Sequence, residues 1–306
     1  MFSSLTQPRF PNAAIGLSRD SVTALSLQKE GRTGFSIKQA STVAIPPGAC
    51  IPSFFDDNLA DPAEFANCLQ DAVTNAGLLS QRRWSVALPA SAARSAIITL
   101  ESRPSARGET EEILDWKAGQ TFGVPAEEMR ISLQNIRPDR EGRPRYFATA
   151  IKLAVIDEYE TAFESFGWRV GLILPRAVSE ANWLLGRSTG DSILISGQND
   201  GFTALVIRGD EPAVIRTVTC TESGLDDEVY RLLMFYKDRY GSSSNSLDRL
   251  LVVGKGLASH KIGAVASDAL GFDAPMAGAA DIGLFLPSAE FDLSDIAAPA
   301  GLALLA

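Results

Sequence analysis

Cysteine and histidine are scarce in this sequence. Its 306 residues include three cysteines and one histidine. Cys50, Cys68 and Cys220 are odd in number, far apart and without paired spacing, so we expect neither a disulfide framework nor a zinc site. A reduced, cytoplasmic compartment suits such a set. Any catalytic arrangement that needs histidine would rest on His260, whose position at the start of a predicted helix favours a structural or surface role.

Clustered basic residues and long apolar runs are also missing. The formal net charge is -9, and nucleic-acid binding depends on clustered lysine and arginine, so we expect no nucleic-acid partner. Arg82-Arg83 and the loop Arg137–Arg145 are interpreted as solvated surface. No window is long enough for a membrane-spanning helix, and the N-terminus lacks the apolar core of a signal peptide. We expect the apolar run Ala297–Ala306 to be a docked terminal helix, and any contact with a membrane to pass through a partner.

The chain is long enough for two domains, with 45% hydrophobic and 21% charged residues. The stretch Ala14–Leu27, AIGLSRDSVTALSL, predicts a buried strand, a polar turn at Ser18–Ser21 and a second strand. A third strand is predicted at Phe35–Ile45. Asp61 followed by Pro62 indicates the start of a helix that ends near Gly77. A strand at Trp84–Leu88 completes this first unit.

The next block has the pattern of a compact α+β insert. Its acidic helix Glu109–Gln120 is predicted to bury Trp116 together with Ile113 and Leu114. The other predicted elements are a strand at Ala96–Leu100, a hairpin of strands at Arg130–Ile136 and Tyr146–Ile151, and a helix from Val155 to Phe166.

The second half begins as the first does. A strand at Trp168–Leu174 and a helix at Pro175–Leu185 lead to three strands at Ser192–Ser196, Phe202–Ile207 and Ala213–Thr219, which indicates a weak internal repeat. The remaining predicted elements are an amphipathic helix from Leu225 to Tyr240, a buried strand Arg249–Val253, a turn Gly254-Lys255-Gly256, a helix that ends at Leu270, and a final helix that Asp295 would cap.

This order of elements resembles the actin-like ATPase fold. Within it the sequence resembles the type IV pilus assembly protein PilM family, with the cell-division protein FtsA a more distant relative. The stretches that carry the resemblance are AIGLSRDSVTALSL at 14–27, ETEEILDWKAGQTFGVPAEEM at 109–129, AVIDEYETAFESFGWRV at 154–170, SILISGQNDGFTALVIRGDEPAVIRTVT at 192–219, LLVVGKGLASH at 250–260 and PAGLALLA at 299–306. The block at 109–170 resembles the subdomain that PilM and FtsA insert into their first half.

The resemblance implies an α/β, two-lobed actin-like fold, which is a duplicated ribonuclease H-like fold, with an α+β subdomain inserted into the first lobe. It assigns residues 1–90 and 171–187 to the first lobe, 91–170 to the inserted subdomain and 188–294 to the second lobe. A C-terminal helix at 295–306 is expected to dock back on the first lobe.

The resemblance also implies where a nucleotide pocket would lie, at Gly16, Ser18, Ser21, Gly197, Gly254 and Gly256. Nucleotide-binding members carry an Asp-x-Gly pattern at both turns, and the acidic residue manages the hydrated magnesium. This sequence has Gly16-Leu17-Ser18 and Ile195-Ser196-Gly197 instead, with Thr23 where lysine is common. A magnesium-nucleotide site needs a carboxylate, so we interpret the pocket as vestigial.

We therefore expect no catalytic residue, no metal site and no cofactor, with ATP and magnesium as the open alternative. Asp20 and Asp200 lie near the two turns, but we expect them to point elsewhere. The glycines of Gly254-Lys255-Gly256 are interpreted as backbone turn residues, and Lys255 as a surface lysine.

The PilM resemblance implies a scaffold of the inner-membrane assembly platform that binds the N-terminal cytoplasmic peptide of a PilN-like membrane protein, among other pilus assembly proteins. An extended peptide would add to a strand edge in a groove between the first lobe and the insert. Two alternatives stay open: an active actin-like ATPase, and the cytoplasmic part of a type II secretion component. Trp116, Phe122 and Phe147 are candidate peptide contacts that also suit a core.

Overall fold

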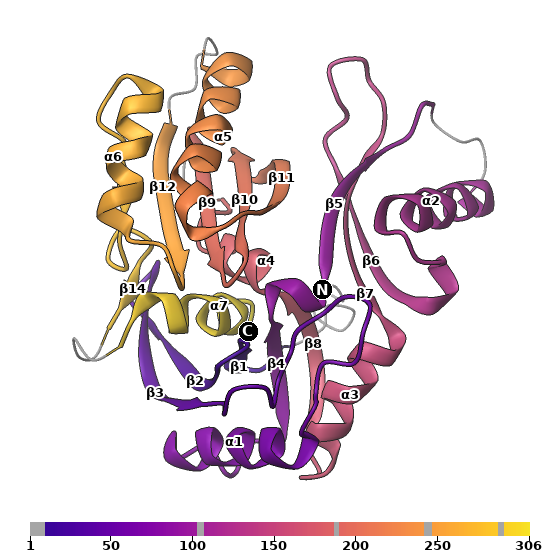
Figure 1. Ribbon diagram of the computed structural model, residues 1–306, viewed down its shortest axis with the longest axis vertical. Coiled ribbons are helices and arrows are strands. Elements are labelled where there is room, and N and C mark those ends of the chain that lie inside the picture. The colour runs from indigo at the N-terminus through magenta and orange to yellow at the C-terminus, as the bar shows by residue number, and fades with distance from the viewer. Residues whose placement is uncertain (1–9, 103–106, 187–189, 242–246, 287–290) are drawn as a thin grey trace.

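The computed structural model describes residues 10–102, 107–186, 190–241, 247–286 and 291–306. These residues form three β-sheets with helices packed on and between them (Figure 1). No helix among them is both long and apolar enough to cross a lipid bilayer.

The first lobe is a mixed sheet in the order β14-β3-β2-β1-β4-β8. Alternate residues of β1 enter different cores: Ile15 and Leu17 pack beneath α1 and α3, whereas Ala14 faces the interior between the lobes. A sheet covered on both faces requires continuously apolar strands, and all five residues of β1 are buried. The elements of this lobe are β1 (Ala13–Leu17), β2 (Ser21–Glu30), β3 (Gly34–Ala44), α1 (Pro62–Asn75), β4 (Arg83–Leu88), α3 (Leu153–Glu164), β8 (Arg169–Pro175) and β14 (Leu284–Phe285).

The second lobe repeats this arrangement in the order β11-β10-β9-β12-β13. Helices α5 and α6 cover one face of its sheet, and the other face looks toward the first lobe (Figure 1). The three-strand openings expected from the sequence are present in both lobes. The elements are β9 (Asp191–Gln198), β10 (Gly201–Arg208), β11 (Glu211–Thr219), α5 (Leu225–Tyr240), β12 (Leu247–Gly254), α6 (Ser259–Leu270) and β13 (Met276–Ala277).

The insert is a small antiparallel sheet in the order β5-β7-β6, with α2 on one face. Its elements are β5 (Arg94–Thr99), α2 (Arg107–Phe122), β6 (Met129–Ile136) and β7 (Arg145–Lys152). Phe122 and Phe147 are buried, but Trp116 is 65% exposed, so its prediction as part of the buried side of α2 is wrong.

Four boundaries differ from the sequence predictions. Helix α3 was placed in the insert, yet its side chains, among them Tyr159 and Phe163, pack with α1 in the core of the first lobe. Strand β14 was placed with the second lobe, but it pairs with β3. The helix after Pro175 is α4 (Arg176–Ala181), shorter than predicted, and the final helix α7 (Leu293–Ala303) is capped by Asp292 rather than Asp295.

Helices α4 and α7 form a layer between the two large sheets (Figure 1). From Ile296 to Ala303 the α7 sequence is apolar on every side, as expected for an enclosed stretch of helix, and all eight of these residues are buried. The backbones of the two helices approach so closely that a Cβ atom on Gly301 would lie 2.0 Å from the carbonyl oxygen of Ser179. Trp183 Nε1 donates a hydrogen bond of 2.9 Å to the Ala297 carbonyl, and Asn182 donates one of 3.0 Å to the Gly301 carbonyl.

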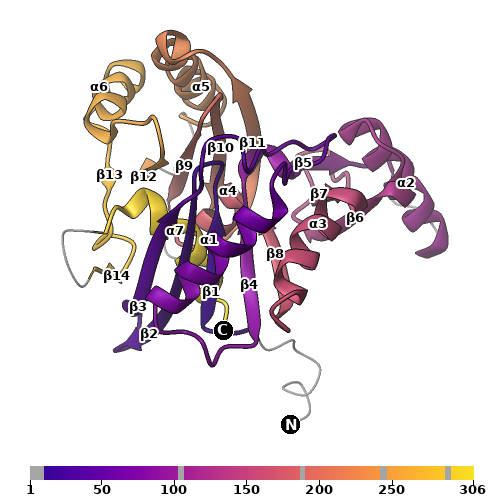
Figure 2. The same ribbon diagram turned by 60° about the horizontal axis from the view of Figure 1, so that its bottom comes forward.

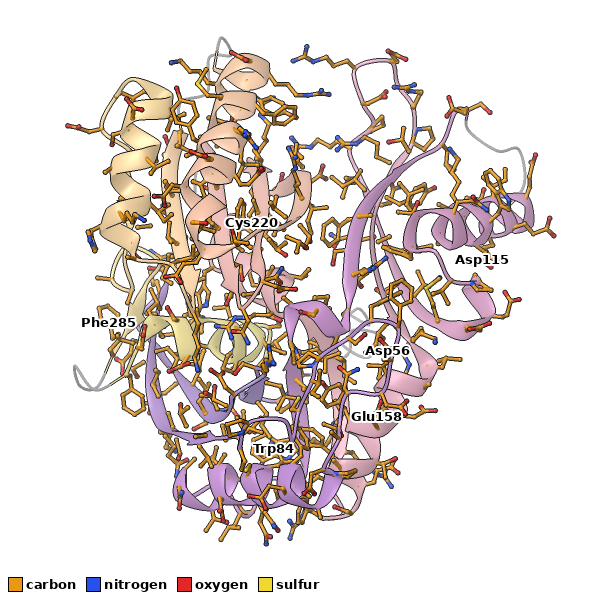
Figure 3. All side chains as sticks on the ribbon, viewed as in Figure 1. Asp56, Trp84, Asp115, Glu158, Cys220 and Phe285 are labelled. Atoms are coloured by element: carbon orange, nitrogen blue, oxygen red, sulfur yellow. The ribbon has the colours of Figure 1, made fainter. Side chains whose placement is uncertain are left out.

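A loop that follows Cys50 attaches the insert to the first lobe. Glu158 of α3 accepts hydrogen bonds from the backbone N–H groups of Asn58 and Leu59 at 2.9 and 2.8 Å. Earlier in the loop, Phe54 and Phe55 contact the insert: the Arg94 guanidinium of β5 lies 4.7 and 4.6 Å from their ring centres. Figure 3 shows Glu158 beside the part of the loop that carries Asp56. The orientation of the insert is thus fixed by contacts at its base.

Replacing Gly301 with alanine tests the contact between α4 and α7. We expect Gly301→Ala to lower the free energy of unfolding by about 3 kcal/mol, because the added methyl group meets backbone that cannot rotate away. Urea denaturation measures the change. The matched control is Gly119→Ala in α2, where the nearest atom is 3.5 Å from the added Cβ, and there we expect a gain of about 0.5–1 kcal/mol. Equal effects at the two sites would contradict the close approach.

Candidate functional site

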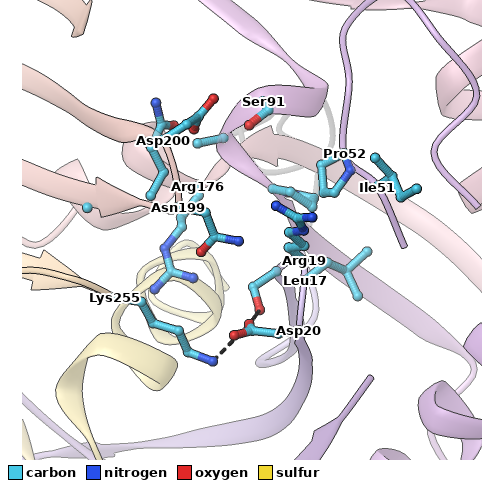
Figure 4. Close-up of a pocket in the computed structure, with 15 residues that line it drawn as sticks. Leu17, Arg19, Asp20, Ile51, Pro52, Ser91, Arg176, Asn199, Asp200 and Lys255 are labelled. Atoms are coloured by element: carbon cyan, nitrogen blue, oxygen red, sulfur yellow. Dashed lines mark hydrogen bonds and ion pairs between the residues drawn. The ribbon is translucent and has the colours of Figure 1, made fainter. Parts of the chain in front are cut away.

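A cleft between the lobes is formed by the β1–β2 turn on one side and the β9–β10 and β12–α6 turns on the other. It encloses a cavity of about 160 Å³. Pockets for small molecules typically measure about 300–1,000 Å³, so this one is small. The lining residues are Leu17, Ser18, Arg19, Asp20, Ile51, Pro52, Pro89, Ala90, Ser91, Arg176, Gly197, Gln198, Asn199, Asp200 and Lys255 (Figure 4).

The β1–β2 turn satisfies its own polar groups. Ser18 Oγ lies 2.7 Å from Ser21 Oγ, and it accepts a hydrogen bond of 3.0 Å from the Ser21 N–H. Ser18 Oγ also donates a hydrogen bond of 2.8 Å to Asp20 Oδ1. Of the two predicted site serines, Ser18 lines the cavity and Ser21 supports it from within the turn.

Gly16 does not line the cavity. It is buried on β1 beneath α7, and a Cβ atom at this position would lie 2.7 Å from Cδ of Pro299. The missing side chain is therefore explained by the packing of α7. An aspartate at this position would collide with the Pro299 ring.

The glycines of the second lobe serve strand packing and turn geometry. Gly254 pairs with Gly197 in neighbouring parallel strands, and its φ of 98° is a conformation that favours glycine. A Cβ atom on Gly254 would lie 2.4 Å from the Gly197 carbonyl oxygen. Gly256, with φ 80°, lies outside the cleft cavity and lines an adjoining cavity of about 310 Å³. Of the predicted site residues, Ser18 and Gly197 therefore line the cleft cavity. Gly254 is paired with Gly197, and Gly256 lines the adjoining cavity.

An ion pair connects the two sides of the cleft. Lys255 Nζ lies 2.8 Å from Asp20 Oδ1, and the dashed line in Figure 4 marks this contact. Burial raises the pKa of the Asp20 carboxyl, but hydrogen bonds from Lys255 and Ser18 lower it by more, so its pKa lies below the ordinary value. Asp20 points into the cleft, contrary to the prediction from sequence, and Lys255 bridges the lobes.

Two charged residues on α4 lie at the base of the cleft. Arg176 lines the cavity, and its Nε donates a hydrogen bond of 2.8 Å to Glu180, which is fully buried. Burial raises the pKa of Glu180, although Arg176 opposes that rise. A second guanidinium nitrogen of Arg176 donates to the Ser294 carbonyl of α7. The arginine is therefore committed to the contact between α4 and α7.

Asp20 and Asp200 are the carboxylates that line the cavity and could contact a metal ion. Asp20 is engaged by Lys255, and Asp200 lies apart from that pair (Figure 4). Neither Asp20 nor Arg176 was predicted from the sequence as a site residue. The acid of an -Arg-Asp-Ser- turn was a usable signal for Asp20, whereas Arg176 is brought to the cleft by tertiary packing alone.

A separate groove lies between β8 and the insert. It encloses about 250 Å³, and it is bounded by strands that stand at the edges of their sheets, β8 and β6. Val170, Leu172 and Leu174 of β8 are partly exposed on its floor. At the rim the Arg130 guanidinium pairs with Glu160 at 2.5 Å. This is the position at which the sequence predicted a peptide groove.

Replacing Gly16 with aspartate tests the explanation of the missing carboxylate. We expect Gly16→Asp to lower the free energy of unfolding by at least about 2 kcal/mol, because the side chain is forced against Pro299 in a closed core. Thermal unfolding in parallel with Gly16→Asp/Pro299→Ala measures the effect. The second substitution should recover part of the loss, and a Gly16→Asp variant as stable as the parent chain would refute the collision.

Comparison with known proteins supports this fold. No family model matches the chain, and no curated protein matches it. Among solved structures, the PilM-PilN type IV pilus biogenesis complex is similar at a TM-score of 0.74 and 15% identity, over 97% of this chain and 98% of that one. The cytoplasmic domain of EpsL, an inner-membrane component of the type II secretion system of Vibrio cholerae, has a TM-score of 0.47 at 13% identity. That match covers 79% of this chain and 81% of the other. A Bacteroides thetaiotaomicron protein of unknown function with an actin-like ATPase fold has a TM-score of 0.45 at 14% identity, over 96% of this chain and 94% of the other.

At 15% sequence identity, the similarity to the PilM-PilN complex shows that the fold is shared. The resemblance to PilM, stated from the sequence, is confirmed at that level. The chain has the two-lobed actin-like fold with an α+β subdomain inserted into the first lobe.

Proposed function

We propose that this protein is a scaffold of a type IV pilus assembly platform, which binds an extended N-terminal segment of a PilN-like inner-membrane protein. The groove between β8 and β6 is the observation that carries the proposal. It is bounded by two edge strands, and apolar side chains of β8 line its floor. The similar structure is described as a complex of PilM with PilN, and the match covers nearly the whole of both chains. In this role the protein acts on the cytoplasmic side of the inner membrane, which it reaches through its partner.

The geometry of the groove suits a peptide in extended conformation. A peptide strand beside β8 would receive hydrogen bonds from its unpaired edge, and alternate side chains would point toward the floor. Five of the seven β8 residues are apolar or glycine with part of their surface exposed. Ser132 and Thr149 give the opposite wall small polar side chains. The ion pair between Arg130 and Glu160 offers both signs of charge at the rim.

We further propose that the interlobe cleft has lost magnesium-nucleotide binding. Three features support this. Pro299 occupies the space that a carboxylate at position 16 would need, Asp20 is bound to Lys255, and the cavity of about 160 Å³ is smaller than ordinary ligand pockets. A lysine that neutralises the nearest carboxylate also opposes the approach of a divalent cation. The cleft then serves to join the lobes.

Blocking the groove tests the peptide proposal. We expect Ser132→Trp, which places an indole in the groove, to weaken binding of a labelled peptide from the first 25 or so residues of the PilN-like protein at least tenfold. Fluorescence anisotropy measures the affinity. The matched control is Gln134→Trp, two residues along β6, which is exposed but does not line the groove and should leave the affinity within twofold. Binding that survives Ser132→Trp, or that is lost equally in the control, would refute this site.

Isothermal titration with ATP and magnesium tests the proposed loss of nucleotide binding. We expect no saturable heat up to about 1 mM nucleotide, for the parent chain and for Lys255→Met alike. Freeing Asp20 from its ion pair does not supply the carboxylate that is missing at position 16. A dissociation constant in the micromolar range would overturn this proposal and favour an active ATPase. If Lys255→Met bound ATP and the parent chain did not, the ion pair between Asp20 and Lys255 would be what prevents nucleotide binding. That result would refute the role assigned to Pro299.

A further inference from the structure

Three arginines gather at the end of the first lobe where β4 and β8 begin. Arg83 and Arg169 are the first residues of these two parallel strands, and they are partners in the strand register. Arg82 adjoins them, because its carbonyl accepts a hydrogen bond of 2.8 Å from the Arg169 N–H. All three are exposed, and none forms an ion pair with another residue that the structure describes. Figure 2 shows the start of β4 at the lower margin of the molecule, away from α5 and α6 of the second lobe.

The segments that meet here are basic within an acidic chain. Residues 10–12, 76–83 and 165–169 contain the three arginines and no acidic residue, whereas the whole sequence carries a net charge of -9. Like charges at adjacent positions of neighbouring strands repel each other. The three guanidinium groups therefore do not stabilise the fold by pairing of charges, and their arrangement favours an anionic ligand that comes from outside the chain.

Apolar side chains lie beside the arginines. The Gln81 N–H donates a hydrogen bond of 2.9 Å to the Leu78 carbonyl, and this turn carries Leu79, which is 53% exposed. The Arg82 guanidinium donates a hydrogen bond of 3.3 Å to the Leu79 carbonyl. An open hollow of about 310 Å³ adjoins the turn, where Phe10 and Pro11 line it together with Gln81, Arg82 and Arg83. We call this surface the basic patch: Phe10, Pro11, Leu79, Arg82, Arg83 and Arg169.

We propose that the basic patch binds directly to the surface of a membrane that contains anionic phospholipids, with its arginines at the phosphate groups and Leu79 at the boundary of the acyl chains. The planar guanidinium donates paired hydrogen bonds that match phosphate oxygens. This contact goes beyond the proposed function, in which the protein reaches the membrane through its partner.

The charge distribution would give the bound protein one orientation. Attraction between a basic residue and an anionic membrane falls off within a Debye length, which is about 10 Å at 0.1 M salt. The basic patch can approach the lipid phosphates to within this distance, while the acidic remainder of the chain is repelled and turns away. The second lobe would then lie on the side away from the bilayer.

Charge and apolar surface are both needed for this contact. Basic clusters that bind anionic lipids usually contain about four to eight lysine and arginine residues, and the basic patch has three. Binding of a protein to a membrane surface grows with the apolar area that enters the interface as well as with charge. Leu79 and Phe10 supply apolar area next to the arginines. We therefore expect weak, reversible binding that strengthens a second attachment.

A lipid surface fits the basic patch better than a nucleic acid does. Nucleic-acid binding depends on many phosphate contacts along a backbone, and three arginines at one end of a chain with a net charge of -9 offer few. The exposed leucine of the turn contributes nothing to such contacts, whereas a bilayer offers it an apolar region to enter.

The basic patch adjoins one end of the proposed peptide groove. Strand β8 begins at Arg169, and the next residue, Val170, already lines the groove between β8 and β6. A peptide strand beside β8 that runs toward Arg169 would leave the groove at the basic patch and could continue from there into a bilayer. The lipid contact does not require this peptide, so the two proposals can fail separately.

Flotation of the full chain with lipid vesicles tests the proposal at about 100 mM salt. We expect the protein to float with phosphatidylcholine vesicles that contain about 40% phosphatidylglycerol and not with phosphatidylcholine alone. Arg82→Gln/Arg83→Gln should lower the partition coefficient at least tenfold. The matched control, Arg140→Gln/Arg239→Gln, makes the same change in net charge at exposed arginines outside the basic patch and should stay within twofold. No binding to the anionic vesicles, equal binding to both kinds of vesicle, or equal loss in the control would overturn the proposal.

A second pair of variants tests the apolar contribution. We expect Leu79→Ser to weaken vesicle binding at least threefold while the arginines remain. Phe272→Ser, at a residue that is 49% exposed and outside the basic patch, should leave it within twofold. Unchanged binding of Leu79→Ser would refute the entry of this turn into the interface, and displacement of the vesicles by an octamer of deoxythymidine would contradict the assignment to lipid.

Urea denaturation of Arg169→Gln separates a role toward lipid from a role in the fold. We expect the free energy of unfolding to stay the same or rise, because the substitution removes repulsion from Arg83. A fall in the free energy of unfolding would assign the arginine to the fold and contradict the proposal. Ser132→Trp should leave vesicle binding unchanged, which keeps this result independent of the β8–β6 groove; a loss of vesicle binding in this variant would contradict the separate site.

Discussion

The packing of α4 against α7 is the contact on which the arrangement of the lobes depends. One apolar helix fills the space between two sheets, and the glycine at position 301 lets its backbone touch that of its neighbour. Interiors are packed as densely as organic crystals, so a layer this close leaves little freedom to slide. The position of every turn at the cleft follows from this layer, since β1, β4, β9 and β12 all have residues or ends that adjoin it.

The same layer underlies the proposal that the cleft has lost magnesium-nucleotide binding. The ring of Pro299 in α7 fills the space beside Gly16. Arg176, at the base of the cleft, donates a hydrogen bond to the α7 backbone. What the cleft retains, the ion pair between Asp20 and Lys255, crosses from one lobe to the other. The proposed peptide groove lies between β8 and β6, which are edge strands of their sheets.

Local patterns predicted most elements because strand alternation and helix capping are encoded within a few residues. The bounds of α5 matched the prediction from Leu225 to Tyr240, and Asp61 caps α1 as expected. Long-range packing was not encoded in that way. The apolar face of α3 gives no sign of which core it joins, and Trp116 has the spacing of a buried residue although it faces solvent. Similarly, Gly16 was interpreted from its place in a motif, whereas the reason for glycine there lies 283 positions along the chain, at Pro299.

Hydrogen exchange of the full chain, with and without the N-terminal peptide of the PilN-like protein, tests the central claim most directly. The account predicts that the peptide slows exchange in β8 and β6 and leaves the β1–β2 and β12–α6 turns of the cleft unchanged, because only the edge strands gain new hydrogen bonds. Protection confined to the cleft turns, with β8 and β6 unaffected, would contradict the claim that this fold works through its strand edges.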